Sequence, residues 1–111
     1  MRVIMMEPSK KPEVKEIDGS LSGMQAIVGG SIELFCPFEN ENVGVIVNEE
    51  GKLLKLPINR AVFQENRLID ILVGPAFIVR LDPDEEDFQS LTDKQIDMLM
   101  PKITNIEIYC D

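Results

Sequence analysis

The chain has 111 residues, of which 44% are hydrophobic and 28% are charged, and its formal net charge is −9. This length suits one domain spanning residues 1–111, and the hydrophobic share favours an ordered core over wholesale disorder. The acidic balance excludes a broad basic face for nucleic acid and repels anionic membranes, so we expect neither as a direct partner.

The first quarter of the chain predicts two strands and a helix. Residues 2–6 are apolar and indicate a strand, and residues 13–17 indicate a short strand that suits a sheet edge. Asp18 or Ser20 is expected to cap a helix with one apolar face. Gly29 is expected to end this helix in a left-handed conformation.

The middle of the chain contains the strongest local signal, a predicted hairpin. Residues 32–38 read as a strand that Pro37 confines to an edge or an end, and a turn at 39–42 follows. Residues 43–47 are apolar on both faces and are expected to be central in the sheet. A turn at 48–52 then leads to Leu53–Leu56, which we expect to return antiparallel.

Beyond the hairpin, residues 57–66 suggest a short helical turn, and two strands at 69–73 and 76–81 flank Gly74-Pro75. The Gly-Pro pair indicates a bend in the strand more than an approach point for a ligand. Residues 82–87 form an expected solvated acidic loop.

The last segment predicts a second helix and a final strand. Thr92 and Gln95 have the spacing of a capping box, Pro101 limits the helix, and residues 106–110 alternate as a strand does. We therefore expect an α+β fold, with a mainly antiparallel sheet of about five to seven strands and two helices.

Cysteine usage and the amino terminus indicate the compartment. Cys36 and Cys110 each lie in an apolar run, and two cysteines are few for an oxidised secreted domain, so we expect two reduced, buried thiols. The apolar start stops at Glu7 and Pro8, too early for a signal peptide or a membrane span. These features favour a cytoplasmic protein.

The chain contains no histidine, which removes the commonest general base and metal ligand. This absence excludes serine or cysteine nucleophiles paired with histidine, and it excludes histidine-containing zinc sites. No glycine pattern for phosphate binding is present. The acidic residues at 82–87 suit Mg²⁺ or Ca²⁺ by ligand type but lack the spacing of a calcium loop. We expect no cofactor, no metal and no catalytic activity.

One polar and basic stretch is the candidate ligand site. Asn59 and Arg60 follow a predicted strand, where a loop can present an amide and a guanidinium to a phosphate or carboxylate. We predict that Lys52, Asn48 and Arg67 join them. The alternative is structural, with Asn59 capping a turn and Arg60 paired with an acid.

Several short motifs follow one another along the chain. They are Pro37-Phe38-Glu39, Asn48-Glu49-Glu50-Gly51-Lys52, Leu56-Pro57-Ile58-Asn59-Arg60-Ala61, Asp70-Ile71 to Phe77-Ile78-Val79 and Ser90-Leu91-Thr92-Asp93-Lys94-Gln95, preceded by Glu7-Pro8 and the segment from Val14 to Ile17. In this order they resemble the family catalogued as domain of unknown function 3846, over almost the whole chain up to Pro101. The resemblance implies a small accessory protein of Gram-positive bacteria, their phages or other mobile elements, and it implies no catalytic residues.

These observations leave four functional hypotheses. The first is a non-catalytic protein that binds or sequesters a host component, such as a host-defence protein or a small nucleotide-like ligand held by Asn59, Arg60 and Lys52. The second is an acidic decoy for a nucleic-acid-binding host protein, because residues 81–111 carry −7 of the net charge. The third is a carboxylate enzyme that uses a divalent ion. The fourth is a homodimer formed through the alternating tail at 106–110.

Overall fold

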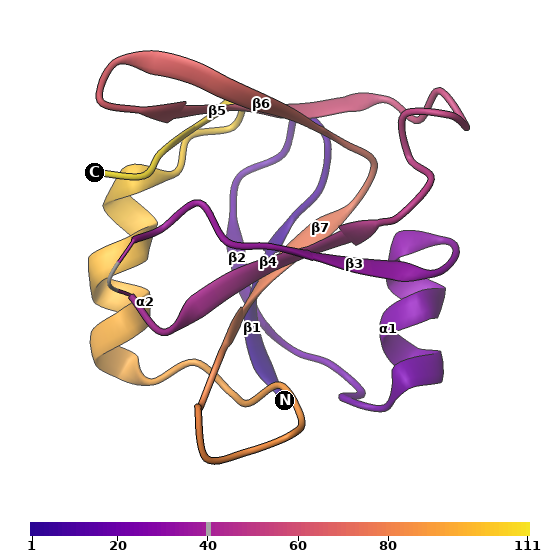
Figure 1. The fold of residues 1–111 in the computed structure, drawn as a ribbon, viewed down its shortest axis with the longest axis vertical. Helices are drawn as coiled ribbons and strands as arrows, with labels where there is room; N and C mark the ends of the chain where they lie inside the picture. Colours follow the sequence, from indigo (N-terminus) through magenta and orange to yellow (C-terminus); the bar gives the residue numbers. More distant parts are fainter. Residues whose placement is uncertain (40) are drawn as a thin grey trace.

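The fold combines two β-sheets with two α-helices in a computed structural model that describes residues 1–39 and 41–111 (Figure 1). In chain order the elements are β1 (Arg2–Met6), β2 (Glu13–Glu16), α1 (Leu21–Val28), β3 (Ile32–Phe35), β4 (Val43–Asn48), β5 (Ile58–Gln64), β6 (Arg67–Val73), β7 (Ala76–Arg80), α2 (Asp93–Leu99), the 3-10 helix η1 (Met100–Lys102) and β8 (Glu107–Tyr109). The turn expected at 39–42 includes Asn40, which lies outside the described residues.

The larger sheet has five strands in the order β2-β1-β7-β4-β3, and all of its neighbours pair antiparallel. Ile78 of β7 lies opposite both Ile4 of β1 and Val45 of β4, so these three side chains share one face. All three are fully buried. The apolar residues of β1, β4 and β7 point alternately to the two faces, which makes this sheet the centre of the molecule.

One face of the large sheet is covered by α1. Met24 and Val28 of the helix pack on Val3, Ile46 and Phe77. The Ser20 side chain caps the first turn by accepting from the backbone N–H of residue 23, and residue 29 ends the helix with φ of 83°. The predicted cap and the left-handed stop are both confirmed.

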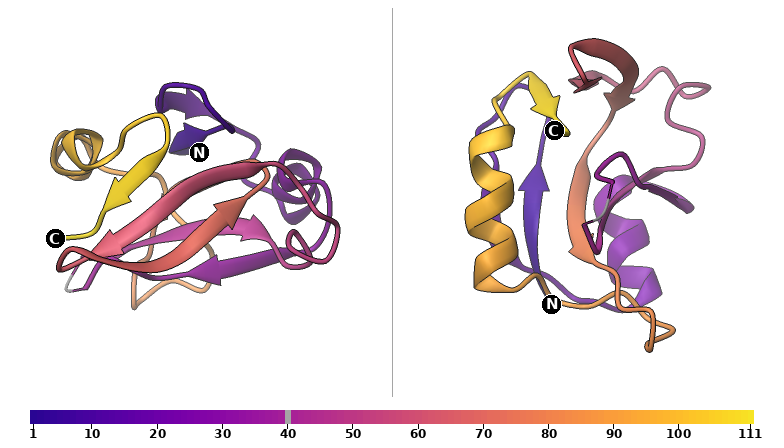
Figure 2. Two further views of the ribbon diagram at one scale, coloured as in Figure 1. Left: turned by 90° about the horizontal axis from the view of Figure 1, so that it is seen from above. Right: turned by 60° about the vertical axis from the view of Figure 1, so that its left-hand side comes forward.

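The opposite face is covered by α2 together with the smaller sheet (Figure 2). Leu99 of α2 and Ile108 of β8 pack into the same buried cluster as Ile4 and Ile78. Thr92 and the Gln95 side chain form the predicted capping box, with bonds of 3.1 and 3.0 Å. The helix therefore starts where the sequence predicts.

The smaller sheet has three strands in the order β6-β5-β8. β5 pairs antiparallel with β6 and parallel with β8, where Val62 lies opposite Ile108. Both residues are fully buried against the large sheet. The ring of Tyr109 stacks on Phe63 with centroids 5.6 Å apart and remains 39% exposed, because no described element covers this outer face.

The fold class is confirmed, with mostly antiparallel strands and two helices. The eight strands form two sheets, whereas we expected one sheet of about five to seven strands. The short strand at 13–16 and the strand at 32–35 lie at the two edges of the large sheet, as predicted.

Two local predictions around the middle of the chain were wrong. Leu53–Leu56 does not return as a strand, since residues 49–55 form consecutive turns in which Leu53 is 83% exposed and Lys55 has φ of 54°. Strand β5 occupies residues 58–64, where we expected a helical turn. Asn59 and Arg60 are therefore inside a strand and not in a loop, because β5 pairs with β6 in the smaller sheet.

The two thiols lie in different environments. Cys110 is buried as expected, and both cysteines are unbonded to each other. Cys36 is exposed, which corrects the expectation of two buried thiols. Cys36 lies just beyond the end of the edge strand β3, at Phe35.

Candidate ligand-binding cleft

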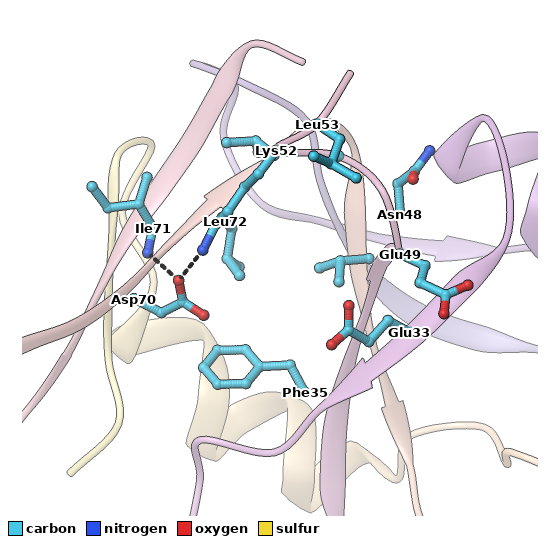
Figure 3. A pocket seen from close by; sticks show the side chains of 12 residues that line it. Glu33, Phe35, Asn48, Glu49, Lys52, Leu53, Asp70, Ile71 and Leu72 are labelled. Atoms are coloured by element: carbon cyan, nitrogen blue, oxygen red, sulfur yellow. Dashed lines mark hydrogen bonds and ion pairs between the residues drawn. The ribbon is translucent and has the colours of Figure 1, made fainter. Parts of the chain in front are cut away.

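A cavity of about 310 Å³ opens between the two sheets, at the edge strands β3 and β6 (Figure 3). On one side, Glu33 of β3 lies opposite Val47 of β4, so both side chains point from the large sheet toward the small one. On the other side, Asp70 lies opposite the buried Val62 and therefore points inward from the small sheet. The turn at 49–55 closes one end of the cavity.

Residue Gly51 lets this turn pass close to the small sheet. A Cβ atom at this position would lie 2.9 Å from Cγ2 of Val73, which is too close for any other residue without a shift. The turn is fixed further by backbone bonds from Gly51 N to Asn48 O and from Leu56 N to Gly51 O, at 3.2 and 3.1 Å. The glycine therefore positions Lys52 at the mouth of the cleft.

Lys52 and Asp70 form an ion pair across the mouth, with Nζ donating to Oδ1 at 2.7 Å. The same oxygen accepts the backbone N–H of Ile71 at 2.7 Å. The lysine side chain is 69% exposed and the aspartate 32%, so solvent screens the pair and its contribution to stability is about 0–1 kcal/mol. This lysine is held weakly and can be displaced.

The carboxylates in the lining outnumber the one lysine. Glu33, Glu49 and Asp70 against Lys52 give the lining a net charge of −2. Figure 3 shows the carboxylates of Glu33 and Asp70 pointing into the cavity from opposite walls, whereas Glu49 points away. Within residues 1–39 and 41–111, the Glu33 carboxylate has no ion-pair or hydrogen-bond partner. The ring of Phe35 lies between the two walls.

Asn48 is part of the cleft lining, but its amide points away from the cavity (Figure 3), and the residue is 6% exposed. Its Nδ2 donates to the carbonyl oxygen of Val28 at 3.1 Å, and its Oδ1 accepts the backbone N–H of Glu50 at 2.7 Å. The side chain thus ties the end of α1 to the start of the turn. Its polar atoms already serve the fold.

Asn59 and Arg60 do not reach the cleft, because both are buried inside the protein, at 3% and 0% exposure. Arg60 donates from Nε to the carbonyl oxygen of Thr104 at 2.7 Å and from its terminal nitrogens to those of Glu7 and Lys10 and to Oδ1 of Asn59. Burial lowers the pKa of its guanidinium. Asn59 donates to the carbonyl oxygens of Met6 and Gly74, at 2.8 and 2.7 Å.

These bonds give Asn59 and Arg60 a structural role that neither of our two interpretations describes. Neither side chain faces solvent, and the partners of Arg60 are backbone carbonyls and an amide, not a carboxylate. The guanidinium joins β5 to the loop after β1 and to the segment before β8.

The structure thus divides the five predicted site residues into groups. Lys52 and Asn48 both line the cleft without a bond between them, and Asn59 and Arg60 are bonded to each other in the interior. Arg67 is exposed at the start of β6 and is not part of the cleft lining. Sequence reasoning missed Glu33, Phe35 and Asp70. The signal for Asp70 was a single carboxylate within the apolar run 68–73.

Other features outside the cleft are reported for the same described residues. In the acidic loop expected at 82–87, Asp84 to Asp87 are exposed as predicted, whereas Asp82 is half-buried and pairs with Arg80 at 3.3 Å. No group of three metal-binding side chains is found in residues 1–39 and 41–111. None of the helices described is both long and apolar enough to cross a bilayer. Burial and the neighbouring Asp111 raise the pKa of Cys110 to about 11.

Comparison with known proteins identifies a family. No curated protein and no solved structure was found to match the chain. The sequence model of the family described as domain of unknown function (DUF3846) matches residues 1–104. This match includes both sheets up to the last strand, as well as every residue that lines the cleft. The chain therefore belongs to the DUF3846 family.

Proposed function

We propose that this protein acts by binding a ligand in the cleft between its two sheets, without transforming it. The observation that carries this proposal is the 310 Å³ cavity itself, which combines an apolar floor with a few inward-pointing polar groups. Such a combination is typical of binding sites, where apolar walls contribute affinity and sparse polar groups contribute specificity. In a phage or mobile-element setting, the ligand would be a component of the host.

The charges of the cleft argue against a nucleotide-like ligand. A phosphate needs several donors or cations, and the donors that suggested it, Asn59 and Arg60, are engaged in the interior. Lys52 is already paired with Asp70, and Glu33 would repel an anion. We therefore place neutral and cationic ligands ahead of anionic ones.

The test is a binding screen read by amide chemical shifts. Cyclic nucleotides, NAD-derived compounds, neutral sugars and organic cations are added in turn to isotope-labelled protein. A true ligand shifts the amide signals of Glu33, Lys52 and Asp70 together, while distant signals stay in place.

A matched pair of variants makes the screen specific for the cleft. Phe35→Ala removes a ring from the cleft, whereas Phe88→Ala removes the same ring from the side of the large sheet that faces α1. Binding should be weakened only by the first. Turnover of any compound, or shifts that never include the cleft residues, would contradict the proposal.

A second candidate function is an acidic decoy, and the exposed run Asp84–Asp87 favours it. The segment 81–111 carries −7 of the net charge, so it can steer a basic partner toward the molecule. Neutralising Asp84, Glu85, Glu86 and Asp87 to their amides should release a partner captured from host lysate, as should high salt. A partner retained after both changes would contradict this function.

A further inference from the structure

The cleft also indicates which class of ligand it takes. We infer that it binds an organic cation on an aliphatic stem, the group carried by a lysine or arginine side chain. This inference rests on the proposed function, because it names the ligand of the same site.

The lining places negative charge on two opposite walls. The carboxylates of Glu33 and Asp70 point into the cavity from different sheets, so a cation in the cavity lies between two negative charges (Figure 3). Asp70 is 32% exposed, and a partly dehydrated carboxylate attracts a cation more strongly than one in open water. Glu33 is exposed and has no partner of its own within the described residues, so its charge is screened by solvent but open to a ligand.

The floor of the cleft suits the remainder of such a ligand. Phe35, Val47 and Leu72 supply apolar surface between the two carboxylates. A methylene stem packs on such surface while its charged end stays near polar groups. The ring face of Phe35 also attracts a guanidinium or ammonium directly, and guanidinium is the commoner partner. An apolar neutral ligand would use the floor but leave both carboxylates unpaired.

The chain itself shows how the mouth holds such a group. The Lys52 ammonium donates to Asp70 Oδ1 at 2.7 Å, which is the contact that an incoming cation would make. Lys52 is 69% exposed and belongs to a turn, not to a strand, so it can move away without disturbing either sheet. We infer that Lys52 competes with the ligand for Asp70 and sets its affinity.

The experiment compares matched ligands by calorimetry on the full chain. Nα-acetyl-arginine methylamide is the cation, and the corresponding citrulline compound is its neutral equivalent of nearly equal shape. The arginine compound should bind at least about tenfold tighter, and added salt should weaken only that binding. Agmatine and the peptide acetyl-Gly-Arg-Gly-amide then distinguish a free metabolite from a protein side chain.

Isosteric variants test the two walls. Glu33→Gln and Asp70→Asn should each lower the affinity for the arginine compound about tenfold, because each removes a charge and keeps an acceptor oxygen. Glu86→Gln, on the exposed acidic loop, makes the same charge change away from the cleft and is the control. Equal losses in all three variants would overturn the assignment, because the effect would then be one of net charge alone.

A change at Lys52 should raise the affinity for the arginine compound, whereas the changes at Glu33 and Asp70 should lower it. Lys52→Met should raise the affinity several-fold by freeing Asp70, while Lys94→Met, on the exposed side of α2, should leave it nearly unchanged. A loss of affinity in Lys52→Met would overturn the inferred competition.

Failure of this inference can be told apart from failure of the proposed function. If a neutral or anionic compound binds and shifts the cleft amides, the cleft is a binding site and only the ligand class is wrong. If no compound of any charge shifts them, both are wrong.

Discussion

Arg60 and Lys52 are two cations from neighbouring parts of the chain, and they have opposite surroundings. Arg60 is fully buried and donates to three backbone carbonyl oxygens. Lys52 is 69% exposed and meets one carboxylate at the mouth of a cavity. The difference shows that the role of a basic residue depends on the acceptors around it: unpaired backbone carbonyl oxygens for Arg60, and an exposed carboxylate for Lys52.

Arg60, together with Asn59, connects segments of the interior that no strand pairing connects. The loop after β1 and the segment before β8 leave carbonyl groups that no strand pairs with, and buried polar groups without partners are costly. The planar guanidinium, with five donors, can reach several of them at once. Lys52 has no such role, because its only side-chain bond is the exposed ion pair with Asp70.

The largest expected effect is on stability, in Arg60→Met. This change leaves the carbonyl oxygens of Lys10 and Thr104 without their donor, while that of Glu7 keeps only the backbone N–H of Lys10. We therefore expect a loss of about 3 kcal/mol or more in the free energy of unfolding. Lys52→Met should change it by less than about 1 kcal/mol. Urea unfolding followed by circular dichroism measures both. Equal losses would erase the distinction between the two cations.

The next largest effect is a difference in reactivity between the two thiols, one at the surface and one inside. At pH 8 a thiol reagent should modify Cys36 rapidly, because it is exposed. Cys110 is 7% exposed and burial raises its pKa to about 11, so its thiolate is about a hundredfold scarcer than that of an ordinary cysteine. Mass spectrometry should find one label per native chain and two after unfolding. Equal labelling rates would contradict the burial of the tail.

A smaller loss is expected for the amide beside Arg60. Asn59→Ala removes the donor to the carbonyl oxygens of Met6 and Gly74, which should cost about 1–3 kcal/mol. The control is Asn105→Ala, since Asn105 is exposed and should matter by less than about 0.5 kcal/mol. If both variants unfold at the same urea concentration, the bonds of Asn59 to Met6 and Gly74 do not stabilise the fold.

The smallest effect concerns Tyr109, the only tyrosine of the chain. Its hydroxyl donates to Glu107 Oε1 at 2.7 Å, and this bond raises the pKa of the phenol above its ordinary value. A raised pKa means that the folded state holds the proton more tightly. The stabilisation is therefore complete below the ordinary pKa and is lost as the pH rises through the folded value. Absorbance at alkaline pH follows the titration, and Glu107→Gln should return it toward normal.

Much of the fold could be predicted because its signals are local. The helix cap at Ser20, the left-handed stop at Gly29 and the capping box from Thr92 to Gln95 depend on residues within one turn. Short apolar runs likewise predicted the central strands of the large sheet. These features need no knowledge of the rest of the chain.

The errors arose where a partner distant in sequence decides the structure. Leu53–Leu56 has the composition of a strand, but β4 already pairs with β3 and β7, so no edge is left for it. The loop role predicted for Asn59 and Arg60 was wrong because β5 forms a hairpin with the next strand, β6, and also pairs with the distant strand β8. For the cleft, Glu33 and Asp70 are far apart in sequence, and only the stacking of the two sheets brings them together.

The most direct test of the account is a crystal structure of the protein with acetyl-Gly-Arg-Gly-amide. The account predicts the guanidinium between the carboxylates of Glu33 and Asp70, above the ring of Phe35, with Lys52 displaced and Arg60 unmoved. A peptide bound to the acidic loop at 82–87, or to any surface other than the cleft, would contradict it.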